Sequence, residues 1–243
     1  MKHNCSEPKI NVLNSFSSFE EKTGGIMDIQ GKIIVEFGEM SLANSREGHR
    51  ILFLSVIGEI EGHDLASERT KTTKYEHLLP LLAHAQDDKD IDGVLVLVNT
   101  VGGDCSCGLA VAEMISSIEK PVVSLIIGDS HSIGVPLSVA SDHTVIAPTA
   151  TMIIHPVRLN GTVIGAPQTF DYFKLIQDRI LTFIENHSKA DKKILEKMML
   201  HKGIIAKDLG TILVGKEAVE AGLADEVGGI AESLAWLHKA INH

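Results

Sequence analysis

Residues 93–104 read GVLVLVNTVGGD, and this stretch decides the fold class. Residues 93–99 form a continuous apolar run rich in valine, which predicts a strand buried on both faces. The glycines at 102 and 103 then predict a turn, because glycine adopts positive φ without steric cost. Apolar residues next recur at helical spacing, at Leu109, Ala112, Ile115 and Ile118. The stretch therefore predicts a buried strand, a glycine turn and a helix.

The same pattern repeats on both sides of this unit. Pro121 ends the predicted helix, residues 122–128 (VVSLIIG) predict a second buried strand, and a turn at 128–132 leads into a short helix. Residues 51–60 (ILFLSVIGEI) predict another buried strand, and two short strands follow within residues 143–155. Continuous apolar strands joined by helices are typical of a parallel sheet with right-handed crossovers. The predicted fold class is α/β, with a mostly parallel sheet flanked by helices.

Length and composition favour one domain preceded by an arm. The chain has 243 residues with 44% hydrophobic content, which suffices for one large core. Residues 1–48 mix Ser, Asn, Glu and Gly around a few short apolar clusters, a composition that contributes little to a core. We therefore expect a variable N-terminal arm over residues 1–48 and a single domain over residues 49–243.

Charge and hydropathy exclude several classes of partner. The formal net charge is −10 and no run of Lys and Arg is present, which argues against nucleic-acid binding because phosphate contacts need clustered positive charge. The first ten residues lack the apolar core of a secretory signal, and no apolar stretch reaches the roughly 18 residues of a membrane span. We expect a cytoplasmic protein without a membrane span.

Cysteine and histidine usage predicts no metal site and no other cofactor. The three cysteines, Cys5, Cys105 and Cys107, include no second pair that would complete a zinc site, and we interpret them as reduced thiols. The twelve histidines show no H-E-x-x-H or similar ligand spacing. The Gly-Gly-Asp turn also lacks the Gly-Lys-Ser/Thr ending of a phosphate-binding loop.

Two turns of the predicted sheet form a candidate oxyanion hole. Loops at the carboxyl ends of parallel strands line the ligand crevice, so the turns at 102–104 and 132–134 are expected to face the same crevice. Each turn leads into a helix, whose first backbone N–H groups lack helical partners. Two N–H donors aimed at one point are what a tetrahedral oxyanion requires.

Ser132 and His155 are the candidate nucleophile and base. Ser132 stands where the predicted helix begins, and a helix N-cap is the alternative role for a serine there. The surrounding GDSHS lacks the final glycine of the G-x-S-x-G elbow, so the α/β-hydrolase motif is not met. His155 ends a short strand directly before Pro156, which favours an extended backbone. A neutral imidazole within reach of a serine hydroxyl can accept its proton at physiological pH.

Four motifs in this order resemble the Clp protease proteolytic subunit family, within the wider crotonase-like superfold. They are VLVNTVGGDCSCGLAVAEMI (96–115), HSIG (131–134), TMIIHP (151–156) and GKEAVEAGLADEVGG (215–229). The resemblance spans about residues 51–230 and is closest to the branch of translocation-enhancing proteins. It implies the ClpP/crotonase-like fold, with Ser132 as nucleophile and His155 as base. It also implies that the backbone N–H groups of Gly103 and Ile133 form the oxyanion hole.

The acid of the implied catalytic triad is where the chain departs from the family pattern. In better-known members an aspartate stands shortly before the segment that corresponds to KEAVEAGLAD (216–225). Counting back without a gap reaches Gly210, and Asp208 lies two residues away. The resemblance implies Asp208 as the acid if this loop is longer by two residues; a solvated loop carboxylate is the alternative. A misplaced acid would cost about 10⁴ in kcat.

The resemblance also implies a handle and an oligomeric ring. Residues 156–165 carry the hairpin signal Asn160-Gly161, and residues 167–188 carry an apolar stripe at helical spacing. In the family, a strand and a long helix at approximately 156–189 project to meet an opposing ring, and the strand pairs with peptide substrate. An ordinary core helix is the alternative. The expected partners are a peptide or unfolded protein and further copies of the chain. Because no Walker motif is present, ATP-driven unfolding would come from an unfoldase partner.

The predicted function is a serine endopeptidase, ATP-independent or partner-dependent, that hydrolyses peptides or unfolded proteins in an oligomeric chamber and is linked by its branch to protein export. Two other classes stay open. A crotonase-like acyl-CoA enzyme would use the two N–H donors on a thioester enolate, and it needs a carboxylate in the crevice and a basic rim. A catalytically weak, non-enzymatic assembly scaffold is the third. A Ser-Lys dyad through Lys71 or Lys74 is a variant of the first.

Overall fold

The computed structural model describes residues 39–42, 47–63, 66–67, 69–158, 165–202 and 210–243. The chain divides into two compact units, residues 1–40 and 41–243. Of the first unit, residues 39 and 40 are described, so the predicted arm over residues 1–48 lies almost wholly outside the described residues. The second unit holds all the other described residues.

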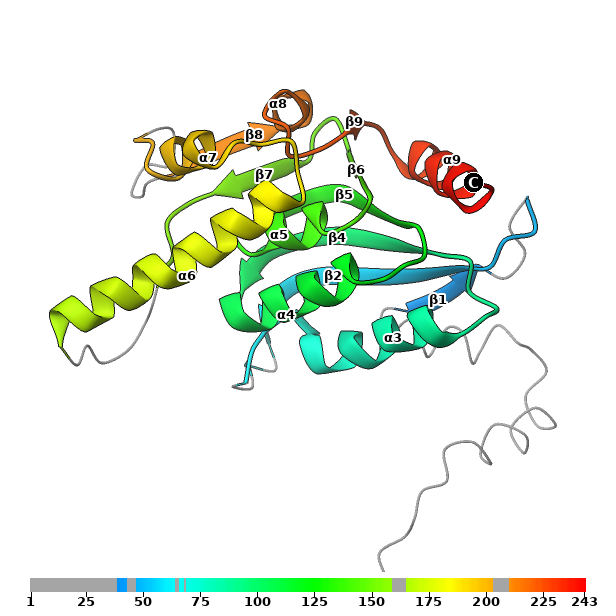
Figure 1. Ribbon diagram of the computed structural model, residues 1–243, viewed down its shortest axis with the longest axis horizontal. Coiled ribbons are helices and arrows are strands. Elements are labelled where there is room, and N and C mark those ends of the chain that lie inside the picture. Colours follow the sequence, from blue (N-terminus) through cyan, green and yellow to red (C-terminus); the bar gives the residue numbers. More distant parts are fainter. Residues whose placement is uncertain (1–38, 43–46, 64–65, 68, 159–164, 203–209) are drawn as a thin grey trace, which may run out of the picture. The chain divides into compact units, whose positions relative to one another are not determined.

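The centre of the second unit is a mostly parallel sheet (Figure 1). From β2 onward its main path has the order β2-β4-β5-β6-β9, with β3 beside β2 and with β7 joining β5 to β8. From β2 onward each pairing is parallel except that of β7 with β8. The α/β prediction is confirmed. The strands are β1 (Glu39–Leu42), β2 (Ile51–Glu61), β3 (Thr72–Lys74), β4 (Gly93–Gly103), β5 (Val122–His131), β6 (His143–Ile146), β7 (Thr151–Ile154), β8 (Thr211–Val214) and β9 (Glu226–Val227).

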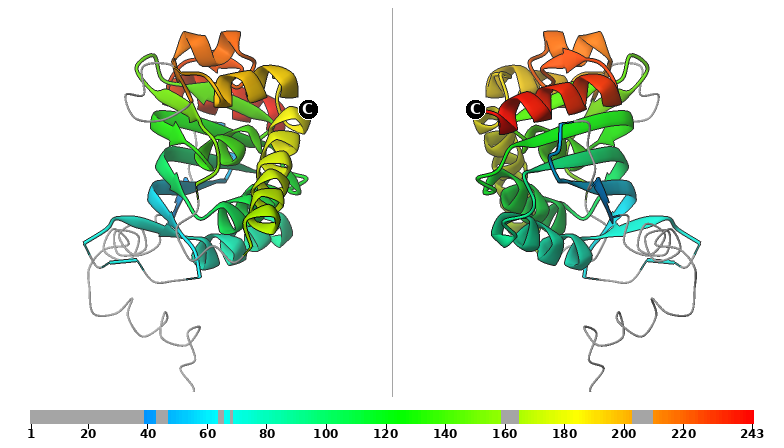
Figure 2. Two further views of the ribbon diagram at one scale, coloured as in Figure 1. Left: turned by 90° about the vertical axis from the view of Figure 1, so that its left-hand side faces the viewer. Right: turned by 90° about the vertical axis from the view of Figure 1, so that its right-hand side faces the viewer.

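Helices cover both faces of this sheet, with α9 on one face and α3, α4 and α6 on the other (Figures 1 and 2). Pro136 lies in the first turn of α5, where its missing N–H is tolerated. None of the helices in the described residues is long and apolar enough to cross a membrane. The helices are α3 (Tyr75–Asp87), α4 (Cys105–Ser116), α5 (Gly134–Val139), α6 (Ala166–Asn186), α7 (Lys192–Met199), α8 (Lys216–Glu220) and α9 (Ile230–Ile241).

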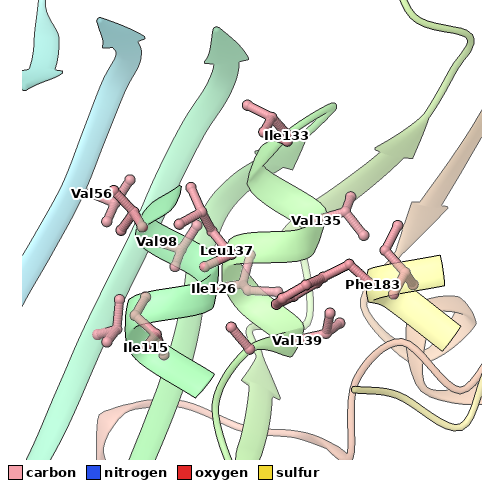
Figure 3. Close-up of a cluster of buried hydrophobic side chains, with 14 of the residues drawn as sticks. Val56, Val98, Ile115, Ile126, Ile133, Val135, Leu137, Val139 and Phe183 are labelled. Atoms are coloured by element: carbon pink, nitrogen blue, oxygen red, sulfur yellow. The ribbon is translucent and has the colours of Figure 1, made fainter. Parts of the chain in front are cut away.

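Alternate residues of the central strands face two layers of the core. Leu95 and Leu125 pack in a small cluster with Leu237 of α9. Their neighbours Val96 and Ile126 belong to a larger cluster that includes side chains of α3, α4, α5 and α6. Figure 3 shows part of this larger cluster, in which side chains from β2, β4, β5, α4, α5 and α6 meet. The continuous apolar runs are thus strands buried on both faces, as the sequence predicts.

Both central strands run further than their apolar runs predict. The turn predicted at 128–132 is wrong, because β5 continues to His131. Over residues 123–126 this strand pairs with β6, and over residues 129–131 it pairs with β7. At the change of partner, the side-chain oxygen of Asn99 accepts a hydrogen bond from the Asp129 N–H at 3.0 Å. This exchange of partners carries the end of β5 beyond the main sheet and places Ser132 beside β7.

The helix of the predicted handle is present, as α6. Its second half is packed, with Ile176, Ile180 and Phe183 buried. None of residues 166–175 is buried, and Phe170 and Leu175 are more than half exposed. The second half of α6 is thus a core helix, and the role of its exposed first half as a handle stays a prediction. The predicted hairpin at Asn160-Gly161 lies outside the described residues.

Candidate active site

Ser132 is held in a strained conformation between β5 and α5. Its φ is +58°, and among the residues that the structure describes it is the one non-glycine with positive φ. Its N–H donates to the Ile153 carbonyl of β7 at 2.9 Å, and its carbonyl accepts from the Val135 N–H of α5 at 3.1 Å. The N-cap of α5 is Ile133 and receives no side-chain capping bond, so the N-cap role for Ser132 is wrong. Such strain persists where the surroundings enforce it, often at functional sites.

Glycines allow the segments around Ser132 to approach one another. Gly102 has φ of +95°, and a Cβ there would lie 2.7 Å from the Ser132 Cβ. A Cβ at Gly108 would lie 2.4 Å from Cγ1 of Ile133, whose side chain is 1% exposed. The buried Thr100 hydroxyl donates to the Gly58 carbonyl and accepts from the Gly102 N–H at 3.0 Å. The end of β4 is therefore fixed to β2, and the Ser132 turn lies close against it.

His155 follows the last residue of β7, and its ring is oriented by the main chain. Its Nδ1 lies 2.7 Å from the carbonyl oxygen of Pro156. Because a carbonyl oxygen can only accept, Nδ1 carries the proton of this hydrogen bond, and in the neutral imidazole Nε2 then holds the lone pair. In the described residues no hydrogen bond joins the Ser132 hydroxyl to His155, a looseness common in ligand-free active sites. The imidazole thus has the tautomer that a base needs.

Four of the five sequence-predicted site residues line one cavity of about 210 Å³. They are Gly103, Ser132, Ile133 and His155. No turn or cap hydrogen bond among the described residues uses the Ile133 N–H, which leaves this donor for a ligand. The remaining walls are mainly apolar: Val101, Cys105, Val135, Ile154, Val157, Arg158, Ile180, Ile184 and Met199.

The residue types that line the cavity bear on two alternatives, the crotonase-like acyl-CoA enzyme and the Ser-Lys dyad. Of the described lining residues none is a carboxylate, and the single cation is Arg158. A crotonase-like enzyme would need a carboxylate in the crevice and a basic rim, and the described lining offers neither. Lys71 and Lys74 are not among the lining residues either, so the lining does not support a Ser-Lys dyad.

The predicted acid, Asp208, lies outside the described residues, so its role stays a prediction. The chain is described again from Gly210, whose N–H donates to the His201 carbonyl at 2.9 Å. Sequence patterns did not predict the Pro156 carbonyl as a partner of His155, because main-chain acceptors carry no residue-type signal.

The two described cysteines are poor nucleophiles. Burial raises the pKa of Cys105, which lines the cavity. Burial, followed by a hydrogen bond to Asp104, raises the pKa of Cys107 to about 11. A thiol with a raised pKa holds little thiolate at neutral pH, and the thiolate is the reactive form. Ser132 is therefore the candidate nucleophile among the side chains of this cavity.

A polar network that the sequence patterns did not predict adjoins the site. His131 Nε2 lies 2.7 Å from the Thr151 hydroxyl, and that hydroxyl donates to Asp129 Oδ1 at 2.8 Å. Burial lowers the pKa of His131; Asp129 opposes this shift and nearby His155 adds to it. These side chains come from β5 and β7, which pair only beyond the apolar run of β5. His131 is not among the residues lining the cavity, although it precedes Ser132.

We predict that His131 makes stability fall below about pH 6.5, its ordinary pKa. Because its folded-state pKa is lowered, the unfolded chain binds a proton there that the folded chain does not. The contribution of His131 to the free energy of unfolding is complete above pH 6.5 and is lost as pH falls through the folded-state pKa. The free energy of unfolding then changes by at most about 1.4 kcal/mol per pH unit. Urea unfolding of wild type and His131→Gln between pH 7.5 and 5 measures this slope.

The His131→Gln variant is expected to show a shallower loss of stability over that pH window than wild type. His84→Gln is the matched control, because His84 is an exposed histidine on α3 outside the network of Thr151 and Asp129. Equal slopes in wild type and His131→Gln would contradict the prediction.

Comparisons with known proteins test the family resemblance. The Clp protease family model matches residues 63–231. The translocation-enhancing protein TepA of Halalkalibacterium halodurans is 44% identical over 224 residues, which cover 92% of this chain and 86% of that protein. The ATP-dependent Clp protease proteolytic subunit 1 of Chlamydia muridarum is 26% identical over 140 residues, covering 55% of this chain and 69% of the relative. The Protochlamydia amoebophila protein of the same name is 29% identical over 139 residues, or 55% and 64% of the two chains.

The family match extends over every element that forms the cavity. It includes the end of β4, the Ser132 turn, β7 and α6, and it reaches the start of α9. The similarity to TepA extends over nearly the whole chain. From the family match and this relative, together with the α/β fold, we conclude that the chain belongs to the Clp protease family.

Proposed function

We propose that this protein is a serine endopeptidase of the Clp type, with Ser132 as nucleophile and His155 as general base. The observation that carries the proposal is the strained Ser132 turn at a cavity that His155 also lines. A positive φ at a serine costs free energy, and the turn is maintained by its bonds to β7 and α5. An ordinary connection between a strand and a helix has no need of that strain.

The proposed reaction follows from the roles of these groups. The Ser132 hydroxyl attacks the peptide carbonyl while Nε2 of His155 takes its proton. The backbone N–H groups of Gly103 and Ile133 would hold the oxyanion, each contributing about 10² to 10³ in kcat. His155 then returns its proton to the leaving amine. Water, deprotonated by the same nitrogen, attacks the ester on Ser132; the C–Oγ bond breaks, and His155 gives the proton to the departing Oγ.

Two groups are candidates for orienting His155 in this reaction. The Pro156 carbonyl holds Nδ1 at 2.7 Å and fixes the productive tautomer. Asp208 is the acid that the family resemblance implies. We propose that the Pro156 carbonyl suffices to orient His155. The activity of Asp208→Ala tests whether Asp208 is also required.

Apolar cavity walls and exposed apolar side chains support the proposals on substrate and assembly. The mainly apolar cavity walls suit an apolar side chain of a peptide or unfolded protein. On the first half of α6, Phe170, Tyr172 and Leu175 are each more than half exposed, which suits an interface between copies of the chain. We propose a homo-oligomeric ring in the cytoplasm. The names of the relatives suggest a link to translocation and an ATP-dependent partner.

Covalent labelling with a fluorophosphonate probe, measured by intact mass, tests the proposal. We expect one adduct per chain on the assembled wild type, because an activated serine attacks the phosphorus as it would a carbonyl. Ser132→Ala should gain no adduct, and His155→Ala should label slowly at most.

Ser130→Ala is the matched control for the labelling. Ser130 is a neighbouring serine that is fully buried and lies 2.9 Å from the Ser138 hydroxyl, so its loss should leave the adduct in place. An assembled wild type that takes no adduct would overturn the protease proposal and favour the scaffold. An adduct that survives in Ser132→Ala would place the nucleophile elsewhere.

A further inference from the structure

Two histidines and a glutamate meet at the end of the domain where β2 begins and α9 ends. Nδ1 of His49 lies 2.9 Å from Nδ1 of His238. The carboxylate of Glu47 is close enough that the three ligand atoms lie within 4.8 Å of one another. His49 and Glu47 immediately precede β2, and His238 lies in the last turn of α9. The two histidines are 189 positions apart in the sequence, so no short ligand-spacing motif predicts them.

The three side chains have the chemistry of a transition-metal site. Imidazole nitrogens with one carboxylate oxygen form a ligand set that zinc uses, whereas magnesium and calcium prefer oxygen ligands. In a tetrahedral zinc site with Zn–N bonds of 2.0–2.1 Å, two nitrogens are about 3.3 Å apart. The 2.9 Å separation is close to this value, so the imidazoles need to part by only a few tenths of an ångström.

Burial and orientation favour the same conclusion. His238 is 9% exposed, and the His49 ring faces it with a centroid separation of 5.1 Å. Glu47 is exposed, and its Oε2 accepts a long hydrogen bond from the Asn242 side chain at 3.4 Å. Partners of this kind orient metal ligands. The guanidinium of Arg50 pairs with Asp90 at 3.0 Å, so this nearby cation has its own partner.

We propose that Glu47, His49 and His238 bind one divalent transition-metal ion of the zinc type, with water completing the coordination. The ion replaces the proton shared by the two Nδ1 atoms, and Glu47 offsets one of its charges. It would connect the segment before β2 to α9, two parts of the chain that are distant in sequence. The site is separate from the Ser132 cavity, since none of its residues lines that cavity.

The test uses the full chain freed of metal by a chelator and then titrated with Zn²⁺ alone. Calorimetry is expected to give one ion per chain. At zinc concentrations near 100 times Kd, the midpoint of thermal unfolding should rise by roughly 5–10 °C, because the ion binds the folded chain only. Mg²⁺ at the same concentration should give no such rise.

Variants identify the ligands. Glu47→Gln and His49→Gln should each weaken zinc binding by at least about 10- to 100-fold, the range for groups that support metal ligands. Glu47 is exposed, so its replacement leaves the fold intact even where a change at buried His238 does not. His84→Gln, an exposed histidine elsewhere, is the matched control and should bind as wild type does.

Cobalt(II) reports the ligand type by its visible absorption. Nitrogen and oxygen ligands give d–d bands without the near-ultraviolet charge transfer that a thiolate produces, so the wild type should show only the former. Three results overturn the proposal: no zinc bound by the wild type, zinc bound by Glu47→Gln and His49→Gln as tightly as by the wild type, or a thiolate band from the cysteines. In each case the two imidazoles form a hydrogen-bonded pair and no metal site.

Discussion

Replacement of His155 by alanine is expected to lower kcat for peptide hydrolysis by about 10⁶, as much as the loss of Ser132, because nucleophile and base act as a unit. Nδ1 of His155 already donates to the Pro156 carbonyl, which leaves Nε2 free to accept the proton of Ser132. Asp208→Ala is therefore expected to lose less than about tenfold, well short of the roughly 10⁴ lost when a triad acid is removed. Hydrolysis of a fluorogenic peptide by assembled protein measures both variants.

His131→Gln is the matched control for this comparison. Its ring neighbours the site but does not line the cavity, and its hydrogen bond goes to Thr151, so we expect activity within tenfold of wild type. A loss near 10⁴ in Asp208→Ala would identify that residue as the acid and contradict the role given to the Pro156 carbonyl. Activity retained by His155→Ala would remove the base from the proposed mechanism.

The second large effect is expected from Gly102→Ala. The new Cβ would lie 2.7 Å from the Ser132 Cβ and 2.8 Å from the His131 carbonyl oxygen, so the Ser132 turn has to move. The φ of +95° adds backbone strain of about 1–3 kcal/mol for a non-glycine residue. Because a displacement of about 1 Å can cost 10² in rate, we expect labelling of Ser132 to slow by 10² or more.

Gly48→Ala separates the effect of backbone strain from the effect of displacing the Ser132 turn. Gly48 also has positive φ, +80°, but a Cβ there would have nothing within 4 Å. This variant should lose stability from strain alone and keep its labelling rate. Urea unfolding and the rate of fluorophosphonate labelling measure the two quantities. A Gly102→Ala protein that is labelled at the wild-type rate would contradict the placement of Ser132 against the end of β4.

Local patterns in the sequence determined the fold class and indicated the two side chains that we propose as nucleophile and base. The apolar runs of β4 and β5 are continuous, and their flanking glycines and helical spacing are local signals that need no tertiary information. The same is true of Ser132 before α5 and of His155 before Pro156, which sit at the ends of such elements. Parallel strands bring their carboxyl ends to one edge, so these residues were expected to converge.

Only the tertiary structure decided how β5 ends and what orients His155. The continuation of β5 to His131 depends on β7 as a new partner, and a strand's partner is not encoded in its own residues. The Pro156 carbonyl acts as a main-chain group, so residue type does not reveal it. His49 and His238 meet across 189 positions because β2 and α9 pack in the same domain. Contacts of this kind arise from the folding of distant segments together, and the sequence of either segment alone cannot specify them.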